Sequence, residues 1–308
     1  MRDRLVCCGL TTLDVTQVLD RLPAPDEKVV ADGLDVTFGG PAANAAAVAA
    51  GLGVPTTLVT ALGTGALADV ARAGLAAAGV DVVDLAPDAA GVLPVSTVLV
   101  TRATGERAVV SVNGTGAPHL ARPDVALLRG AGALLVDGHH PAAGLALAAA
   151  ARAAGVPVLL DGGSWKPSTA ELLAAVDLAV LSADFAVPGW PQEPAPGAED
   201  PVDGLLDAVA AFGPGFVARS AGPGPVRVRR AAGEGGPART SLRPAAVPAG
   251  GVVDTLGAGD VLHGAMAAAL ARGADPLDAL AEGMRCATES VQHAGARGWL
   301  AGGAVATS

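Results

Sequence analysis

Short apolar runs alternate with alanine-rich stretches of helical character along most of the chain. The runs are apolar at consecutive positions rather than at every second one, which is typical of parallel strands buried on both faces. The stretches between them contain no internal proline. We predict strands at 5–10, 56–61, 133–136, 158–160, 178–181 and 216–219, and helices at 41–53, 66–78, 142–154, 168–175 and 202–211. This order predicts an α/β fold with a doubly wound, mostly parallel sheet flanked by helices.

Two segments do not follow this alternation. Residues 29–38 and 95–112 have strand character, and the second is predicted to be a hairpin about Thr104-Gly105. We expect an accessory sheet, inserted at about 11–38 and 93–113, that closes over a cleft as a lid; a plain edge extension of the main sheet is the alternative. The proline-rich stretch 188–201 is predicted to be a loop, so residues 1–308 are expected to form a single domain.

The stretch Gly257-Ala258-Gly259-Asp260 leads into a proline-free segment, 260–271, that is rich in alanine and predicted to be helical. The backbone N–H groups at such a helix start have no partner within the helix, so they form a ready anion-binding site. Asp260 lies in the first turn, where the helix dipole favours its ionised form. Backbone donors could hold a phosphoryl group while this carboxylate deprotonates an attacking hydroxyl. The alternative is a tight turn followed by an ordinary first-turn acid.

Ligands of open α/β sheets bind beyond the carboxyl ends of the strands. Small and polar residues follow the predicted strands at that edge, namely Thr11, Thr12, Asp14, Gly63, residues 137–140, residues 161–163, Ser182, Asp184 and residues 219–222. Strand-to-helix loops are commonly polar, so each position taken singly is weak support for a site.

The net charge restricts the classes of binding partner, and the cysteine content indicates the redox environment. The 308 residues carry a formal net charge of −10, which argues against nucleic acid or an anionic membrane as the main partner. Three cysteines without metal-type spacing favour reduced thiols and a cytoplasmic protein. Residues 36–68 carry no charge, but glycines and prolines interrupt them, so a buried helix and strand are expected there rather than a membrane span.

Common phosphate-binding motifs are absent from the sequence. The only lysines are Lys28 and Lys166; no glycine precedes a lysine, as a P-loop requires, and neither lysine lies in the strand context of a protein-kinase lysine. The dinucleotide fingerprint fails because Leu262 stands where its third glycine would be. Nucleotide phosphates would therefore be held by backbone N–H groups, arginine and a metal.

Two stretches together resemble the paired signatures of the PfkB/ribokinase family of carbohydrate kinases. They are residues 39–46, Gly-Gly-Pro-Ala-Ala-Asn-Ala-Ala, and residues 254–260, Asp-Thr-Leu-Gly-Ala-Gly-Asp. The resemblance implies transfer of the γ-phosphate of ATP to a sugar hydroxyl beneath a small β-sheet lid. By position it implies that Asp260 is the catalytic base, that Gly257, Ala258 and Gly259 form the anion hole, and that Asp14, Gly39, Gly40 and Asn44 bind the sugar.

The sequence departs from the family at two nucleotide-side motifs. Ser182-Ala183-Asp184-Phe185 stands where many members have Asn-x-x-Glu, so we expect Asp184 to act on Mg²⁺ only through water. Ser220-Ala221-Gly222 occupies the position of the family's Thr-x-Gly loop near the nucleotide. The resemblance therefore implies that Ser220, Gly222 and Gly224 bind ATP. These variants resemble the ketohexokinase-type and sulfofructose-kinase-like branches, which favours a neutral ketose or similar sugar. A monovalent-cation requirement and a homodimer formed through the lid stay open.

Two other functions stay open on the same fold. A nucleoside or other small-alcohol kinase would need aromatic rings for stacking, and Phe38 and Trp165 are the candidates near predicted loops. A sugar- or nucleotide-binding protein without catalysis is the second. The altered stretch 182–185 favours it, and the retained Asp260 argues against it.

Overall fold

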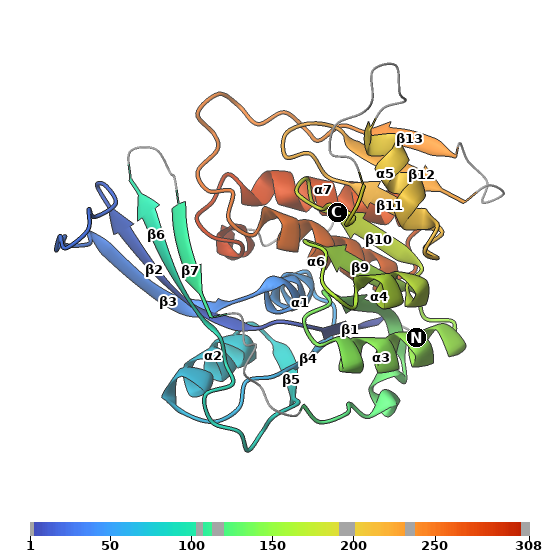
Figure 1. The fold of residues 1–308 in the computed structure, drawn as a ribbon, viewed down its shortest axis with the longest axis horizontal. Helices are drawn as coiled ribbons and strands as arrows, with labels where there is room; N and C mark the ends of the chain where they lie inside the picture. The colour runs from blue at the N-terminus through green and yellow to red at the C-terminus, as the bar shows by residue number, and fades with distance from the viewer. Residues whose placement is uncertain (1–2, 103–106, 113–119, 191–200, 232–237, 303–308) are drawn as a thin grey trace.

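The structure, a computed structural model, describes residues 3–102, 107–112, 120–190, 201–231 and 238–302. Its main sheet has nine strands in the order β13-β12-β11-β10-β9-β8-β1-β4-β5 (Figure 1). Pairing is parallel from β11 to β5, and only β12 and β13 run antiparallel at one edge. The strands are β1 (Arg4–Cys8), β4 (Thr56–Thr60), β5 (Val80–Asp84), β8 (Ala131–Val136), β9 (Val158–Gly162), β10 (Leu178–Leu181), β11 (Phe216–Arg219), β12 (Val226–Arg230) and β13 (Arg239–Leu242). The predicted doubly wound sheet is confirmed.

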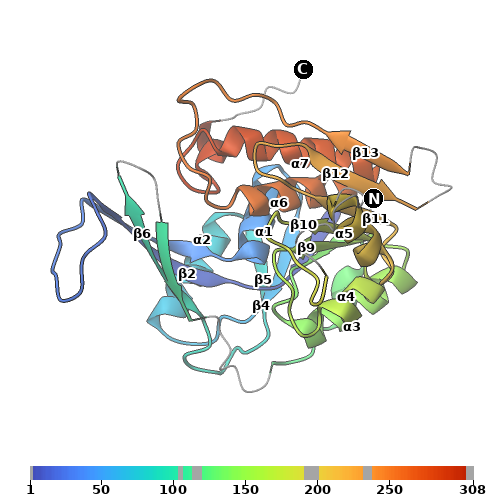
Figure 2. The same cartoon turned by 45° about the horizontal axis from the view of Figure 1, so that its top comes forward.

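Helices cover both faces of this sheet (Figures 1 and 2). One face carries α1 (Pro41–Gly51), α2 (Ala66–Ala77), α6 (Ala258–Ala271) and α7 (Pro276–Ser290), and the other carries α3 (Pro141–Ala153), α4 (Thr169–Ala175) and α5 (Pro201–Ala210). Two short 3₁₀ segments lie at Val125–Leu128 and Gly298–Gly302. Within the described ranges, no helix combines the length and the apolar character that crossing a bilayer requires.

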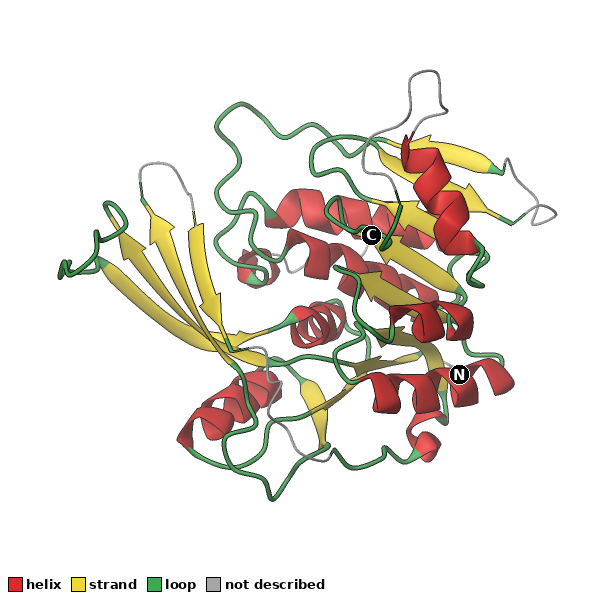
Figure 3. Cartoon of the chain, in the orientation of Figure 1, coloured by secondary structure: helices red, strands yellow, loops and turns green. Residues whose placement is uncertain are grey.

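A separate four-stranded sheet stands beside the main body (Figure 3). Its order is β3-β2-β6-β7, formed by β2 (Thr12–Leu19), β3 (Gly33–Gly39), β6 (Val95–Thr101) and β7 (Arg107–Ser111). The predicted accessory sheet is thus present, and the alternative of an edge extension of the main sheet is wrong. The β6–β7 pair is antiparallel, as a hairpin requires, while the predicted turn at Thr104-Gly105 lies outside the described residues.

Several elements differ from the prediction. Thr12 to Asp14 was expected to be a loop and instead begins β2, because the β-branched Thr and Val residues of this segment favour a strand. The second strand of the accessory sheet starts only at Gly33, not at residue 29. At the edge of the main sheet, β12 carries arginines between its buried valines, so it lacks the continuous apolar run used to find strands.

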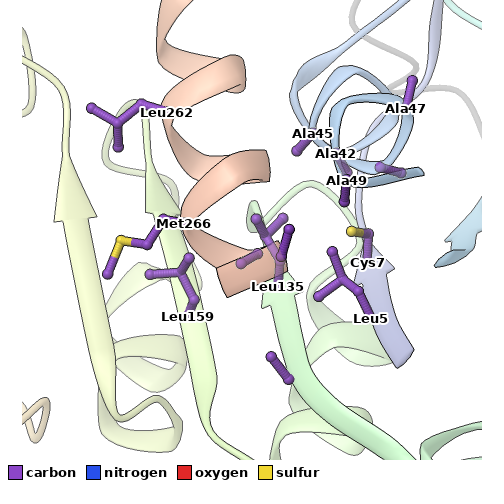
Figure 4. Close-up of a cluster of buried hydrophobic side chains, with 14 of the residues drawn as sticks. Leu5, Cys7, Ala42, Ala45, Ala47, Ala49, Leu135, Leu159, Leu262 and Met266 are labelled. Atoms are coloured by element: carbon purple, nitrogen blue, oxygen red, sulfur yellow. The ribbon is translucent and has the colours of Figure 1, made fainter. Parts of the chain in front are cut away.

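The helices α1 and α6 pack against each other with their backbones unusually close. Both are rich in alanine, and their buried side chains share one core with strands β1, β8 and β9 (Figure 4). A Cβ atom added at Gly264 would lie only 2.5 Å from the carbonyl oxygen of Ala45. This contact fixes how near the two helix N-termini can approach.

We therefore predict that Gly264→Ala destabilises the fold. The added methyl group must separate α1 from α6, and overpacking of this kind costs about 1–3 kcal/mol. Chemical denaturation should show the loss. Gly144→Ala is the matched control, because it also adds a methyl group to a helical glycine but meets its neighbours no closer than 3.7 Å. Equal stability of the two variants would contradict the close-packing argument.

Candidate active site

The site is formed where the N-terminal ends of α1 and α6 meet. The side-chain amide of Asn44, in the first turn of α1, donates a hydrogen bond of 2.7 Å from Nδ2 to Oδ2 of Asp260 in the first turn of α6. Two residues predicted from separate motifs, one for the sugar and one for catalysis, are therefore in direct contact.

The start of α6 presents backbone donors to open space. Gly257, the N-cap residue, has φ 74°, a left-handed conformation that strongly favours glycine. Among the residues that the structure describes, the N–H groups of Gly259 and Asp260 have no hydrogen-bond acceptor. A Cβ atom added at Gly259 would meet nothing within 4 Å. This helix terminus can accept an anion without rearrangement.

Asp14 faces the same region from β2. Its Oδ1 accepts a 2.7 Å hydrogen bond from the Thr12 hydroxyl group. Its Oδ2 lies so close to Gly39 that a Cβ atom there would come within 1.9 Å of it. Gly39 therefore gives the carboxylate room, and Gly40 forms the turn into α1 with φ 95°.

Arg297 also belongs to this site, and the sequence analysis missed it. Its guanidinium group donates to Oδ1 of Asn44, to the hydroxyl oxygen of Thr37 at 2.8 Å and to the carbonyl oxygen of Phe38 at 3.1 Å. The guanidinium carbon lies 3.8 Å from the centroid of the Phe38 ring. The bond to Oδ1 orients the Asn44 amide so that its Nδ2 faces Asp260. An arginine in a loop near the end of the chain carries no periodic signal that could have identified it.

The protonation of Asp260 differs from the expectation. Burial, and then the nearby charge of Asp161, raise its pKa to about 7, although the hydrogen bond from Asn44 and the proximity of His263 oppose the shift. The helix terminus was expected to favour the ionised form of Asp260, but desolvation and a second carboxylate outweigh the dipole and place the pKa well above its ordinary value. The residue as a whole is half-buried.

Asp137, which follows β8, has a structural role next to the site. It accepts hydrogen bonds from the backbone N–H groups of Leu10 at 2.8 Å and His139 at 2.9 Å. Burial alone would raise its pKa, but the charge and hydrogen bonds of His139 and the Leu10 amide bring it down to about 2. Asp137 thus ties the end of β1 to the end of β8.

The predicted nucleotide-side residues lie at the ends of β10 and β11. The Ser220 hydroxyl group donates to the carbonyl oxygen of Leu181 at 3.2 Å, and Gly222 and Gly224 form the exposed turn that follows. Asp184 is exposed in the neighbouring loop, to which Arg219 is tied by a hydrogen bond to the Ala183 carbonyl oxygen. The two loops are adjacent. Their roles toward ATP and Mg²⁺ stay predictions.

The raised pKa of Asp260 predicts a pH-dependent cost in stability. Between its ordinary pKa of 3.8 and about 7, the folded protein holds a proton that the unfolded chain has lost, so stability falls as pH rises through this window. Asp260→Asn should remove the penalty, on the order of 2 kcal/mol after allowance for solvent access. Thermal melts should show the variant above the wild type at pH 8 and equal to it near pH 4. The exposed Asp88→Asn serves as control, and a constant difference at all pH values would contradict the assignment.

Comparison with known proteins places this geometry in a family. The profile described as pfkB family carbohydrate kinase matches residues 2–300. The chain is 28% identical to the ribokinase of Arabidopsis thaliana over 308 residues, covering 95% of this chain and 77% of that protein. It is 33% identical over 178 residues to the ATP-dependent ribose-1-phosphate kinase of Halopiger xanaduensis, covering 57% of this chain and 60% of that protein.

Solved structures agree with the fold. The structure of Arabidopsis thaliana ribokinase complexed with ribose and ATP superposes with a TM-score of 0.75 at 26% identity, covering 96% of this chain and 94% of that chain. The ribokinase of Thermotoga maritima gives a TM-score of 0.73 at 20% identity, covering 96% and 95%, and supports the fold alone. The chain belongs to the pfkB family of carbohydrate kinases, phosphotransferases that act on an alcohol group.

Proposed function

We propose that this protein transfers the γ-phosphoryl group of ATP to a hydroxyl group of a neutral sugar. The observation that carries the proposal is the juxtaposition, at the start of α6, of unpaired backbone donors with the Asp260 carboxyl group. The turn Gly257-Ala258-Gly259 would hold the migrating phosphoryl group, chiefly through the N–H groups of Gly259 and Asp260, because the N–H group of Ala258 donates to the Thr255 carbonyl oxygen at 3.4 Å. Asp260 would accept the proton of the attacking hydroxyl group.

The pKa of Asp260 supports its role as base. A general base works best when its pKa is close to the working pH, and burial raises that of Asp260 to about 7. An ordinary aspartate would be a much weaker proton acceptor. The Asn44 amide holds Oδ2 of Asp260, leaving Oδ1 for the substrate hydroxyl group.

Charge balance at the sugar side favours a neutral acceptor. Asp14 and Asn44 offer the acceptor and donor groups that sugar hydroxyls require. Burial lowers the pKa of Arg297, while the carboxylates of Asp14, Asp35 and Asp260 raise it. Three carboxylates surround this one arginine, so a negatively charged group on the acceptor would be repelled. The name of one relative, a ribokinase, agrees with a neutral sugar acceptor, whereas the name of the other, a ribose-1-phosphate kinase, indicates a sugar that carries a phosphate group.

The aromatic side chains argue against a nucleoside acceptor. Phe38 is only 4% exposed, and the guanidinium group of Arg297 covers its ring. Trp165 packs against Phe185 and Phe212, with ring centroids 6.0 and 5.7 Å apart. Neither ring singled out from the sequence is free to stack on a base, so a sugar is the better acceptor.

We assign the donor nucleotide to the loops after β10 and β11, with Ser220, Gly222 and Gly224 on the ATP side. The related ribokinase structure contains ATP. No group of three or more His, Cys, Asp or Glu side chains capable of holding a metal exists within the described ranges. Mg²⁺ usually keeps several waters and binds through one or two carboxylates together with substrate phosphates. Asp184 is exposed and can contact it through water, and bound Mg²⁺ would neutralise phosphate charge.

The variant Gly259→Ala tests the proposed anion hole without disturbing the fold. Because its Cβ atom meets nothing within 4 Å, the variant should fold normally. The methyl group would point into the proposed phosphoryl site, so we expect kcat to fall at least about 100-fold, as for loss of an oxyanion donor. A coupled assay with ATP over ketoses, pentoses, nucleosides and sugar acids identifies the acceptor. Gly144→Ala is again the control, and normal turnover of Gly259→Ala would exclude this anion hole.

We further propose that residues 1–308 act as one domain whose four-stranded sheet is both lid and dimer surface. Register places Val36, Val15, Thr97 and Val110 in one row across the sheet. Val36 and Val110 are 42% and 73% exposed, and Leu34 on the same face is 68% exposed. Asp14 pairs with Thr37 in the next row and so points to the opposite face. The face that carries Asp14 can close over the sugar, while the apolar face that carries Val36 and Val110 contacts a second copy of the chain.

Val110→Glu should convert a dimer into a monomer in size-exclusion chromatography with light scattering. A buried carboxylate without a partner cannot be accommodated in an apolar interface. Val109→Glu is the matched control, because this neighbouring residue is 56% exposed on the opposite face. A monomeric wild-type protein, or equal loss with both variants, would refute the lid interface.

A further inference from the structure

A buried histidine lies directly beneath the anion-binding end of α6. His263 is 5% exposed and follows Gly259 by one helical turn. Its Nδ1 atom is 2.7 Å from the carbonyl oxygen of Gly259, and its Nε2 atom is 3.0 Å from the carbonyl oxygen of Val180. The ring therefore joins the first turn of α6 to the end of β10.

Both neighbours of the ring are carbonyl oxygens, which only accept hydrogen bonds. A neutral imidazole has one N–H group and could donate to only one of them. The other nitrogen would then direct its lone pair at an oxygen, an unfavourable contact in a buried position. Both contacts are hydrogen bonds only when the ring carries both protons.

The carboxyl group of Asp161 lies close enough to stabilise a positive charge on the His263 ring. Oδ2 of Asp161, at the end of β9, is 3.4 Å from Nδ1 of His263, and the two side chains are 7% and 6% exposed. Burial, and to a lesser degree Asp137, raise the pKa of Asp161 above its ordinary value, and His263, Lys166 and His139 offset this rise only in part. Asp260 is the other carboxylate close enough to respond to His263. The His263 ring thus offsets part of the cost of a negative charge on the buried Asp161.

The contact with Gly259 reaches the anion hole through a single peptide group. The Gly259 carbonyl and the Asp260 N–H belong to the same planar amide, so a hydrogen bond donated to the oxygen polarises the N–H. That N–H group is one of the donors left without an acceptor, within the described residues, at the start of α6.

We propose that His263 and Asp161 form a positioning pair for phosphoryl transfer. The doubly protonated ring, held by the Asp161 carboxylate, donates to the Gly259 carbonyl and so strengthens the Asp260 N–H group as a donor to the phosphoryl anion. This inference rests on the proposed function of the same site, and it places a cation directly beneath the start of α6.

The test uses the full-length protein and the variants Asp161→Asn and His263→Leu. In protein labelled with ¹⁵N-histidine, both ring nitrogens of His263 should carry hydrogen at pH 7. The signals of His263 are assigned as those missing from the spectrum of the His263→Leu variant. In Asp161→Asn, only one should remain protonated. With the acceptor sugar, both variants should lower kcat about tenfold while KM for the sugar changes less than about twofold, because the weakened contact is made to the transferring group.

Met266→Leu is the matched control, since this buried residue lies on the same helix and makes no polar contact in the described chain. A singly protonated His263 ring in the wild type would overturn the pair. So would unchanged turnover in Asp161→Asn, or an equal loss in Met266→Leu. The NMR measurement requires no acceptor, so a failed acceptor panel would count against the proposed function and leave the protonation of His263 as a separate result.

Discussion

The hydrogen bond between Asn44 and Asp260 is the contact on which the site depends. It joins two helix N-termini that are 216 positions apart in the chain. It can form only because α1 and α6 lie almost backbone to backbone, with Gly264 against Ala45. Larger residues at this crossing would separate the sugar-side amide from the carboxylate. The alanine-rich composition of both helices is thus a geometric requirement of the site as well as a source of helix stability.

Carboxylates at the carboxyl ends of neighbouring strands give this site its electrostatic character. Asp137, after β8, accepts several hydrogen bonds and has a pKa of about 2, whereas Asp260 has a pKa of about 7. Asp161, at the end of β9, faces His263, and burial raises its pKa above the ordinary value. Similar groups in one small region therefore take different protonation states, because each has a different number of donors and cations around it. This separation lets one carboxylate organise structure while another takes up protons.

Arg297 connects the accessory sheet to this region. Its hydrogen bonds to Thr37 and Phe38 hold the end of β3, and its bond to Asn44 sets the orientation of the amide. A change in the position of the accessory sheet would therefore be transmitted to Asp260 through the side chains of Arg297 and Asn44. Substrate that fills the space near Asp14 would act on the same connection.

The sequence by itself determined the sheet of parallel strands, the two glycine-led helix starts and the family. These features are encoded locally, since apolar runs, alanine content and glycine placement act over a few residues. It also separated the accessory strands from the main sheet, although β2 was missed because its start at Thr12 is polar. Only the tertiary structure decided the raised pKa of Asp260, the position of Arg297 in the site and the contact of His263 with Asp161. Burial and charge interactions depend on distances through space between distant segments, and no local pattern records those distances.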